Sequence, residues 1–307
     1  MTATATDAGT IAALLNELRT TTNAIAGDEW LSSDLAATPK AQMSELGSNG
    51  KPLQALDSAG VGFLTPMISF LEEPLNQLRG NPDGVRQGAG EFQNASKAAT
   101  TLAGEYGAKA SSETDSWTGE SAAEYAKTGK EIVDGVLSVA ETALTNATAL
   151  IKAGEVVAQV VAEVTRLIAE AVGKIVPIMT QAIAAAAATF GQSIAVAIPQ
   201  CVQIAVECGA QIAAKLGELL ASGENLIKLV EGAQAVLKIV KQAMSVIGDK
   251  AEGGSAESAS STGKASTGTT PGRAELPTVS ARTEADRDSR LVSRSASGSD
   301  RAEQPVG

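Results

Sequence analysis

No proline occurs between Pro82 and Pro177, and this uninterrupted stretch is the feature that most limits what the chain can fold into. Apolar residues recur through its second half at every third or fourth position, which is the period of one helix face. These residues are Val133, Val136, Leu137, Ala140, Leu144, Ala147, Ile151, Val157, Val161, Val164 and Ile168. A helix this long needs a packing partner, because propensity alone does not stabilise it. The sequence therefore predicts a long helix over about 120–170 that buries this stripe.

The apolar residues of the chain are mostly aliphatic. Hydrophobic residues make up 44% of the sequence, but aromatic residues make up only 3%. Alanine is frequent, and it favours helices because it loses no side-chain entropy there. This composition favours an all-α fold of slim, closely packed helices. We expect an antiparallel helical hairpin, extended by long Ala- and Val-rich helices into a helical bundle.

The first two regions of the chain are an N-terminal region, 1–65, and the hairpin, 66–170. Residues 8–27 have helical spacing, whereas Pro and Gly interrupt 28–65 and predict loops with short helical turns. The hairpin would begin with a short helix at 66–79, which would place Met67, Phe70, Leu71, Leu75 and Leu78 on one side. A second helix would follow at 83–112, capped by Asn81 and opened by Pro82. The stripe expected to face the long helix comprises Val85, Ala89, Phe92, Ala95, Ala99, Leu102 and Tyr106.

Residues 171–248 would form a hydrophobic helical region. No charged residue occurs from Ile175 to Val206, and this length would pass the test for a membrane span. Pro177, Pro199 and four glutamines interrupt it, however, and its alanines contribute little to transfer into lipid. A helix that is apolar all round is buried either in a bundle or in a membrane, and both alternatives stay open here.

The C-terminal part divides at about Gly248. Residues 210–248 are amphipathic, and Ser222-Gly223 is expected to split them into two helices. Residues 249–307 are rich in Ser, Gly and Thr and hold few large apolar side chains, which predicts a disordered tail. Cys201 and Cys208 would lie roughly 10 Å apart along one helix, too far to form a disulfide within it. They are either buried small hydrophobic residues or a pair formed between subunits.

Charge and residue types argue against several functions. The net charge of −11 leaves no basic patch for nucleic acid. The chain contains no histidine, which removes the commonest general base and metal ligand. Glu155, Glu163 and Glu170 lie about two turns apart and are expected to form a solvated helix face. Because no glycine-rich phosphate loop is present either, we expect no enzymatic activity, no cofactor and no metal site.

The most specific motif lies between the two predicted helices of the hairpin and runs from Ser116 to Tyr125, with the sequence Ser-Trp-Thr-Gly-Glu-Ser-Ala-Ala-Glu-Tyr. Gly119 permits a turn conformation that a side chain would obstruct, and Glu120 suits the first turn of the next helix. Trp117 would pack over the open end of the hairpin. The residues alone therefore predict a helix–turn–helix closed by an aromatic side chain.

Trp117, Gly119, Ala122, Ala123 and Tyr125 together resemble the central turn of the WxG family, the helical-hairpin substrates of type VII secretion (ESX). The start of the preceding helix, Gly80-Asn-Pro-Asp, also resembles family members, and the likeness covers about residues 72–165. The resemblance implies a four-helix arrangement of two hairpins and export without a cleaved signal peptide. It also implies recognition by a membrane ATPase.

The chain departs from the family at the export signal, a Tyr-x-x-x-Asp/Glu late in the second helix. Tyr106 is followed four residues later by Ala110, and Tyr125 by Gly129. Either a partner protein carries the signal, or the chain is not exported. The N-terminal residues Met1 to Asp7 also lack the basic and apolar pattern of a signal peptide.

These expectations favour a type VII secretion substrate or secretion-associated protein that is not an enzyme. It would act by helix-mediated assembly with a helical protein partner, with further copies of itself, or with a membrane through residues 175–206. The export ATPase would be a partner if the chain is secreted. The expected location is the medium or the cell envelope, or alternatively the cytoplasm. The alternative functions are an intracellular helical scaffold and a membrane-inserting or pore-forming effector.

Overall fold

The computed structural model describes residues 8–47 and 50–260, and this part of the chain is helical and contains no strand. The chain divides into two units, 1–256 and 257–307, and nearly all of the described residues belong to the first unit. The long helices are α1 (Ala8–Ala26), α6 (Pro82–Thr114), α7 (Glu120–Ala185) and α8 (Gln192–Ser260). Shorter elements lie between α1 and α6: α2 (Ser33–Ala37), η1 (Met43–Gly47), α3 (Gln54–Ser58), η2 (Gly62–Leu64), α4 (Thr65–Ile68), η3 (Ser69–Leu71) and α5 (Glu73–Leu78). The predicted all-α bundle built on a helical hairpin is confirmed.

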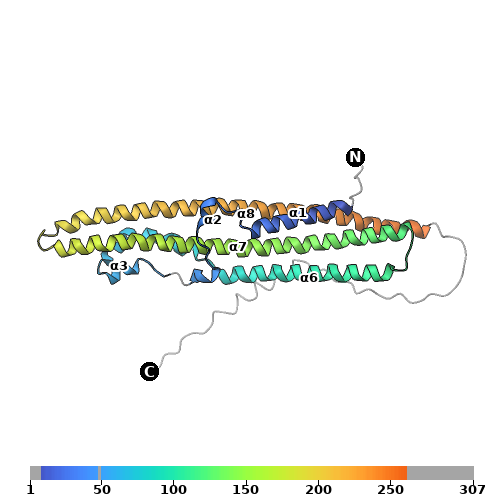
Figure 1. Ribbon diagram of the computed structural model, residues 1–307, viewed down its shortest axis with the longest axis horizontal. Helices are drawn as coiled ribbons and strands as arrows, with labels where there is room; N and C mark the ends of the chain where they lie inside the picture. The colour runs from blue at the N-terminus through green and yellow to red at the C-terminus, as the bar shows by residue number, and fades with distance from the viewer. Residues whose placement is uncertain (1–7, 48–49, 261–307) are drawn as a thin grey trace, which may run out of the picture. The chain divides into compact units, whose positions relative to one another are not determined.

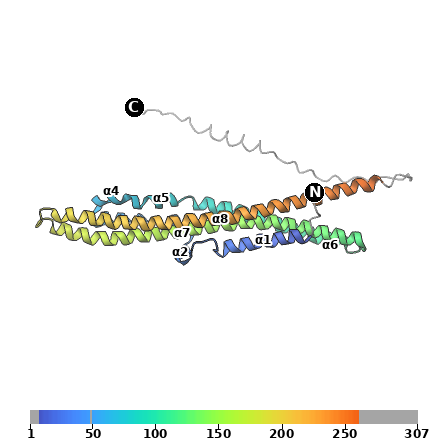
Figure 2. The same cartoon turned by 90° about the horizontal axis from the view of Figure 1, so that it is seen from above.

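The antiparallel pair of α7 and α8 forms the backbone of the first unit, and a tight turn joins the two helices (Figures 1 and 2). They pack closely, since a Cβ added at Gly135 would overlap the sulfur of Met244. Towards the turn they bury Ile175 and Met179 of α7 together with Cys201 of α8. Pro177 and Pro199 both lie inside helices, so the long helix extends past the boundary expected at 170.

The expected break at Ser222-Gly223 is wrong, because α8 runs through it without interruption. Ser222 is fully buried, and its Oγ accepts a hydrogen bond of 3.0 Å from the backbone N–H of Ser32. The small side chain therefore serves a contact with the N-terminal region. The predicted disordered tail begins too early as well, since α8 continues to Ser260; residues 261–307 lie outside the described part.

Helix α1 runs parallel to α7 and antiparallel to α8, and it confirms the helix predicted at 8–27. The hydroxyls of Thr22 and Thr145 share a buried hydrogen bond of 2.8 Å, which fixes the register of α1 on α7. On the α8 side, Ile11 packs on Val240 and Leu18 packs on Val236. The N-terminal region is therefore part of the helical core.

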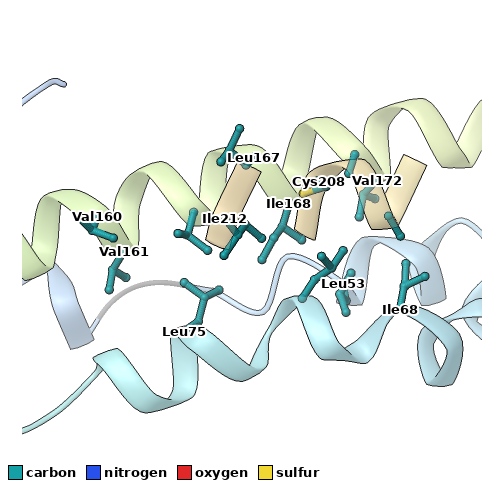
Figure 3. Packing of buried hydrophobic residues seen from close by; sticks show 14 of the residues in the cluster. Leu53, Ile68, Leu75, Val160, Val161, Leu167, Ile168, Val172, Cys208 and Ile212 are labelled. Atoms are coloured by element: carbon teal, nitrogen blue, oxygen red, sulfur yellow. The ribbon is translucent and has the colours of Figure 1, made fainter. Parts of the chain in front are cut away.

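The short elements from α2 to α5 cover the part of the α7–α8 pair nearer the turn. Figure 3 shows Leu53, Ile68 and Leu75 beside side chains of α7 and α8. The single helix predicted at 66–79 is wrong: it is broken into α4, η3 and α5, and Pro74 opens α5. Because the turns are broken, Met67 and Phe70 of the predicted apolar side are exposed, and Ile68 is buried instead.

Helix α7 holds the α2 region through one buried polar side chain. The Nε2 of Gln159 donates hydrogen bonds to the carbonyls of Leu35 at 2.6 Å and Thr38 at 3.0 Å. These two carbonyls lie at the end of α2, where the helix leaves backbone acceptors open. Gln159 of the long helix α7 thus supplies hydrogen-bond donors to the open carbonyls at the C-terminal end of α2.

We expect Gln159→Leu, which keeps the side-chain volume and removes both donors, to destabilise the protein by about 1–3 kcal/mol. A lower midpoint of thermal unfolding, followed by circular dichroism, would show the loss. Gln181→Leu is the matched control, because Gln181 lies on the same helix and is exposed. Equal midpoints for the two variants would contradict the role assigned to Gln159.

Candidate interaction site at the Trp117–Tyr125 turn

The turn between α6 and α7 depends on Gly119. Its φ of 99° lies in the region that residues with a side chain rarely adopt, and it directly precedes α7. The N–H of Trp117 donates to the carbonyl of Thr114 at 2.9 Å, and the N–H of Ala123 donates to the carbonyl of Gly119 at 3.2 Å. These two bonds end α6 and begin α7. The expected role of Gly119 in the turn is therefore visible in its backbone.

The aromatic side chains of the motif lie on the surface. The rings of Trp117 and Tyr125 pack at a centroid distance of 5.5 Å, tilted by 50°, and they are 54% and 39% exposed. Tyr106 of α6 lies near this pair: burial raises the pKa of its phenol, and the neighbouring Tyr125 raises it further. Trp117 therefore does not plug the hairpin end as expected. It forms an exposed aromatic pair with Tyr125, and Tyr106 is close enough to Tyr125 for their charges to interact.

Of the two alanines in the motif, Ala122 is partly buried and Ala123 is exposed. Neither belongs to the exposed aromatic pair itself. Ala123 takes part in the turn through its backbone N–H, and both residues are compatible with the first turns of α7. The structure thus brings together Trp117 and Tyr125 at the surface, with Gly119 as the conformational requirement between them.

Helix α6 packs on α7 through small residues. Ala89 and Ala103 are buried, and a Cβ added at Gly107 would lie 3.5 Å from Val133. The predicted stripe is therefore wrong in part: Val85 packs against the core, but three of its large members do not. Phe92, Leu102 and Tyr106 are exposed instead. Periodicity located the apolar residues correctly, but the small residues beside them allow the closer helix approach.

We call the exposed large apolar residues of α6, the turn and the start of α7 the aromatic flank: Phe92, Leu102, Tyr106, Trp117 and Tyr125. Phe92 and Tyr106 are separated by fourteen residues, which is roughly four helical turns, so they lie on nearly the same side of α6. Val139 of α7 is exposed and lies fourteen residues after Tyr125, so these two residues lie on nearly the same side of α7. The flank therefore extends along both helices of the hairpin.

The two positions where an acidic export residue could follow a tyrosine face each other across the α6–α7 contact. A Cβ added at Gly129 would lie 3.9 Å from the Cβ of Ala110. Gly129 is buried and Ala110 is partly buried. A carboxylate at Gly129 would be placed between packed helices, where an unpaired charge is costly. The small residues at these positions are thus explained by packing.

The glutamates considered for catalysis belong to ion pairs on the surface of α7. Arg166 pairs with Glu163 at 2.6 Å and also contacts Glu170. The hydrogen bond from Arg166 lowers the pKa of the Glu163 carboxyl below its usual value. Glu155 pairs with Lys152 at 3.6 Å. Glu155 and Glu170 match the expected solvated face, whereas the side chain of Glu163 is only 15% exposed.

Cys201 and Cys208 are free thiols buried in the main core cluster. Burial raises the pKa of both thiols, so the unreactive thiol form is favoured. Of the two alternatives for these cysteines, the structure agrees with buried hydrophobic residues. Within residues 8–47 and 50–260, no group of three or more His, Cys, Asp or Glu side chains is placed to hold a metal ion.

A cavity of about 460 Å³ lies between α2 and α7. The charged groups at its edge form ion pairs with one another. Asp28, at a φ of 64°, pairs with Lys40 at 2.6 Å and with Lys152 of α7 at 3.0 Å. Burial acts to raise the pKa of Asp28, but the hydrogen bonds and charges of the two lysines outweigh it and hold the pKa below its usual value. Because these groups are already paired, the cavity offers no open polar group of theirs to a ligand.

We expect Asp28→Asn to destabilise the protein at pH 7, because asparagine tolerates the positive φ but cannot form the two ion pairs. The lowered pKa stabilises the fold above the usual carboxyl pKa of about 4, and this contribution is lost as the pH falls through the folded-state value. The difference in denaturation midpoint between wild type and variant should therefore narrow below about pH 4. Asp83→Asn, in an exposed pair with Arg86, is the control and should change stability little. A pH-independent difference for Asp28→Asn would contradict this assignment.

Comparison with protein families, with curated proteins and with solved structures finds no match for this chain. The likeness to WxG proteins at residues 116–125 is therefore supported only by the residues of the turn and by the antiparallel helices on either side of it.

Proposed function

We propose that this chain is a non-enzymatic protein that works by helix-mediated assembly with a helical protein partner, as a type VII secretion substrate or secretion-associated protein. The observation that carries the proposal is the aromatic flank at the Trp-Thr-Gly turn. The helices of the described part leave these side chains exposed, although they include both tyrosines and one of the two tryptophans of the sequence.

The chemistry of the flank suits a protein partner. Tyr and Trp combine a large apolar ring with one polar group, and they are enriched at protein interfaces and among the residues that contribute most to binding. Leu102 of α6, 58% exposed, adds an aliphatic side chain to the same surface. An amphipathic helix laid along α6 and α7 would bury these side chains, which is a common way of recognising helical partners.

Such a partner would also explain the missing export signal. Gly129 is buried against Ala110 between α6 and α7, where an unpaired acidic side chain would be costly. We propose that the partner supplies the signal and that the two proteins leave the cell together. Both proteins would then be exported only when the export ATPase recognises the partner.

The export part of the proposal is tested by fractionating cells that produce the tagged chain in two strains, one with an active type VII export ATPase and one without. We expect the chain in the medium or envelope fraction only when the ATPase is active. A cytosolic marker protein controls for lysis. Retention in the cytosol of both strains would overturn the secretion proposal and leave an intracellular helical scaffold.

The role of the aromatic flank is tested by Trp117→Ala. Because Trp117 is half exposed, its truncation should lower the free energy of unfolding by only about 1 kcal/mol, the size of one aromatic pair. We expect the ATPase-dependent export to fall severalfold nevertheless, as measured by immunoblotting of the medium.

Phe63→Ala is the matched control, because Phe63 is 50% exposed and lies outside the flank. It should leave export unchanged. Export of Trp117→Ala at the wild-type level, with unchanged helicity and thermal stability, would show that the flank has no part in assembly.

A further inference from the structure

The turn between α7 and α8 presents one large apolar side chain to the surroundings. Phe190 is 99% exposed and has a φ of 50°, a conformation in which a bulky residue is an outlier. The N–H of Gly191 donates to the carbonyl of Ala186 at 2.8 Å, the bond that marks a helix end whose left-handed residue is usually glycine. Neither packing nor turn geometry explains a phenylalanine at this position.

The helices on both sides of Phe190 are free of charge over equal lengths. The nearest charged residues are Lys174 on α7 and Glu207 on α8, and each is sixteen residues from the Phe190-Gly191 turn. The helical parts of these arms are 175–185 and 192–206, which at 1.5 Å per residue are about 16 Å and 22 Å long. One face of each arm is buried between the helices, whereas Ile183, Val196 and Val206 are exposed. We call residues 183–196 the apex.

Several polar groups of the apex form hydrogen bonds within the protein. Backbone N–H groups of residues 186, 189, 191, 192 and 195 each donate to a carbonyl of the same turn. The hydroxyl of Thr189 donates to the carbonyl of Ala185, and that of Ser193 donates to the carbonyl of Ala182 at 2.7 Å. A segment that enters lipid needs its polar groups paired internally, and these bonds meet part of that need.

We propose that the apex is a membrane-contact tip, in which Phe190 and the apolar side chains beside it enter the boundary between headgroups and acyl chains of a lipid bilayer. The tip is free of charge in a chain whose net charge is −11, so it approaches an anionic surface without direct repulsion at the point of contact. This inference is independent of the proposed function, because it involves another end of α7 and requires neither export nor a protein partner.

The same observations limit the depth of insertion. By length and composition, α7 and α8 are both apolar enough to cross a membrane. A spanning helix, however, needs about twenty apolar residues, and each charge-free arm has sixteen. Gln192 lies within the apex and is exposed, and its amide favours the headgroup level. Shallow insertion of about 5–10 Å, as in helices that lie in the interface, satisfies these limits.

The test is flotation of the full chain with vesicles of phosphatidylcholine alone and of phosphatidylcholine with phosphatidylglycerol. We expect the wild type to float with both. Phe190→Ala should reduce the vesicle-bound fraction roughly tenfold or more, in line with the transfer of one aromatic side chain from water. Phe190→Asp should abolish binding, and both variants should keep wild-type helicity because Phe190 makes no buried contact.

Phe63→Ala is again the control and should float like the wild type. A wild-type chain that stays at the bottom of the gradient with both vesicle types would overturn the inference, as would variants of Phe190 that float like the wild type. Binding only to the anionic vesicles that is lost at high salt would also overturn it, because such contact would be driven by charge elsewhere on the chain.

Discussion

Two helices of more than sixty residues each cannot persist singly in water, and in this protein α7 and α8 bury each other's apolar faces. Every other described element packs on this pair. Helix α1 lies along both helices, the short elements from α2 to α5 cover the part nearer the turn, and α6 lies on α7 alone. The close fit at Gly135 and Met244 shows how near the two helices approach. Once this pair is formed, the remaining helices need only short apolar faces of their own.

The period of the apolar residues was enough to predict helices at α1, α6 and α7 and the contact between α6 and α7, but it did not identify α8 as a second partner of α7. The predicted contact of 83–112 with the long helix is present, and α8 also covers much of that helix. Phe92, Leu102 and Tyr106 were assigned to the wrong side because period alone does not distinguish a large apolar side chain from the small residues that permit close packing. Tertiary contact also overrode the local breaking tendency of Ser222-Gly223.

The candidate sites were predictable to different degrees. The turn motif could be located from Trp117, Gly119 and Tyr125, since a glycine between two helical patterns indicates a turn. Its exposed position could not be predicted, because it depends on which face of α6 contacts α7. Phe190 gave no signal in the sequence beyond its place in a charge-free stretch. Its significance comes from an exposure and a backbone angle that only the structure provides.

The aromatic flank and the apex lie at opposite ends of α7, and the length of this helix has its own consequence. Sixty-six residues at 1.5 Å per residue make a spacer of about 100 Å. A ligand at the Trp117 end and a surface at the Phe190 end would be held apart by several times the thickness of a lipid leaflet. The two ends can therefore be occupied together without steric conflict, so that α7 sets a fixed stand-off distance between whatever each end binds.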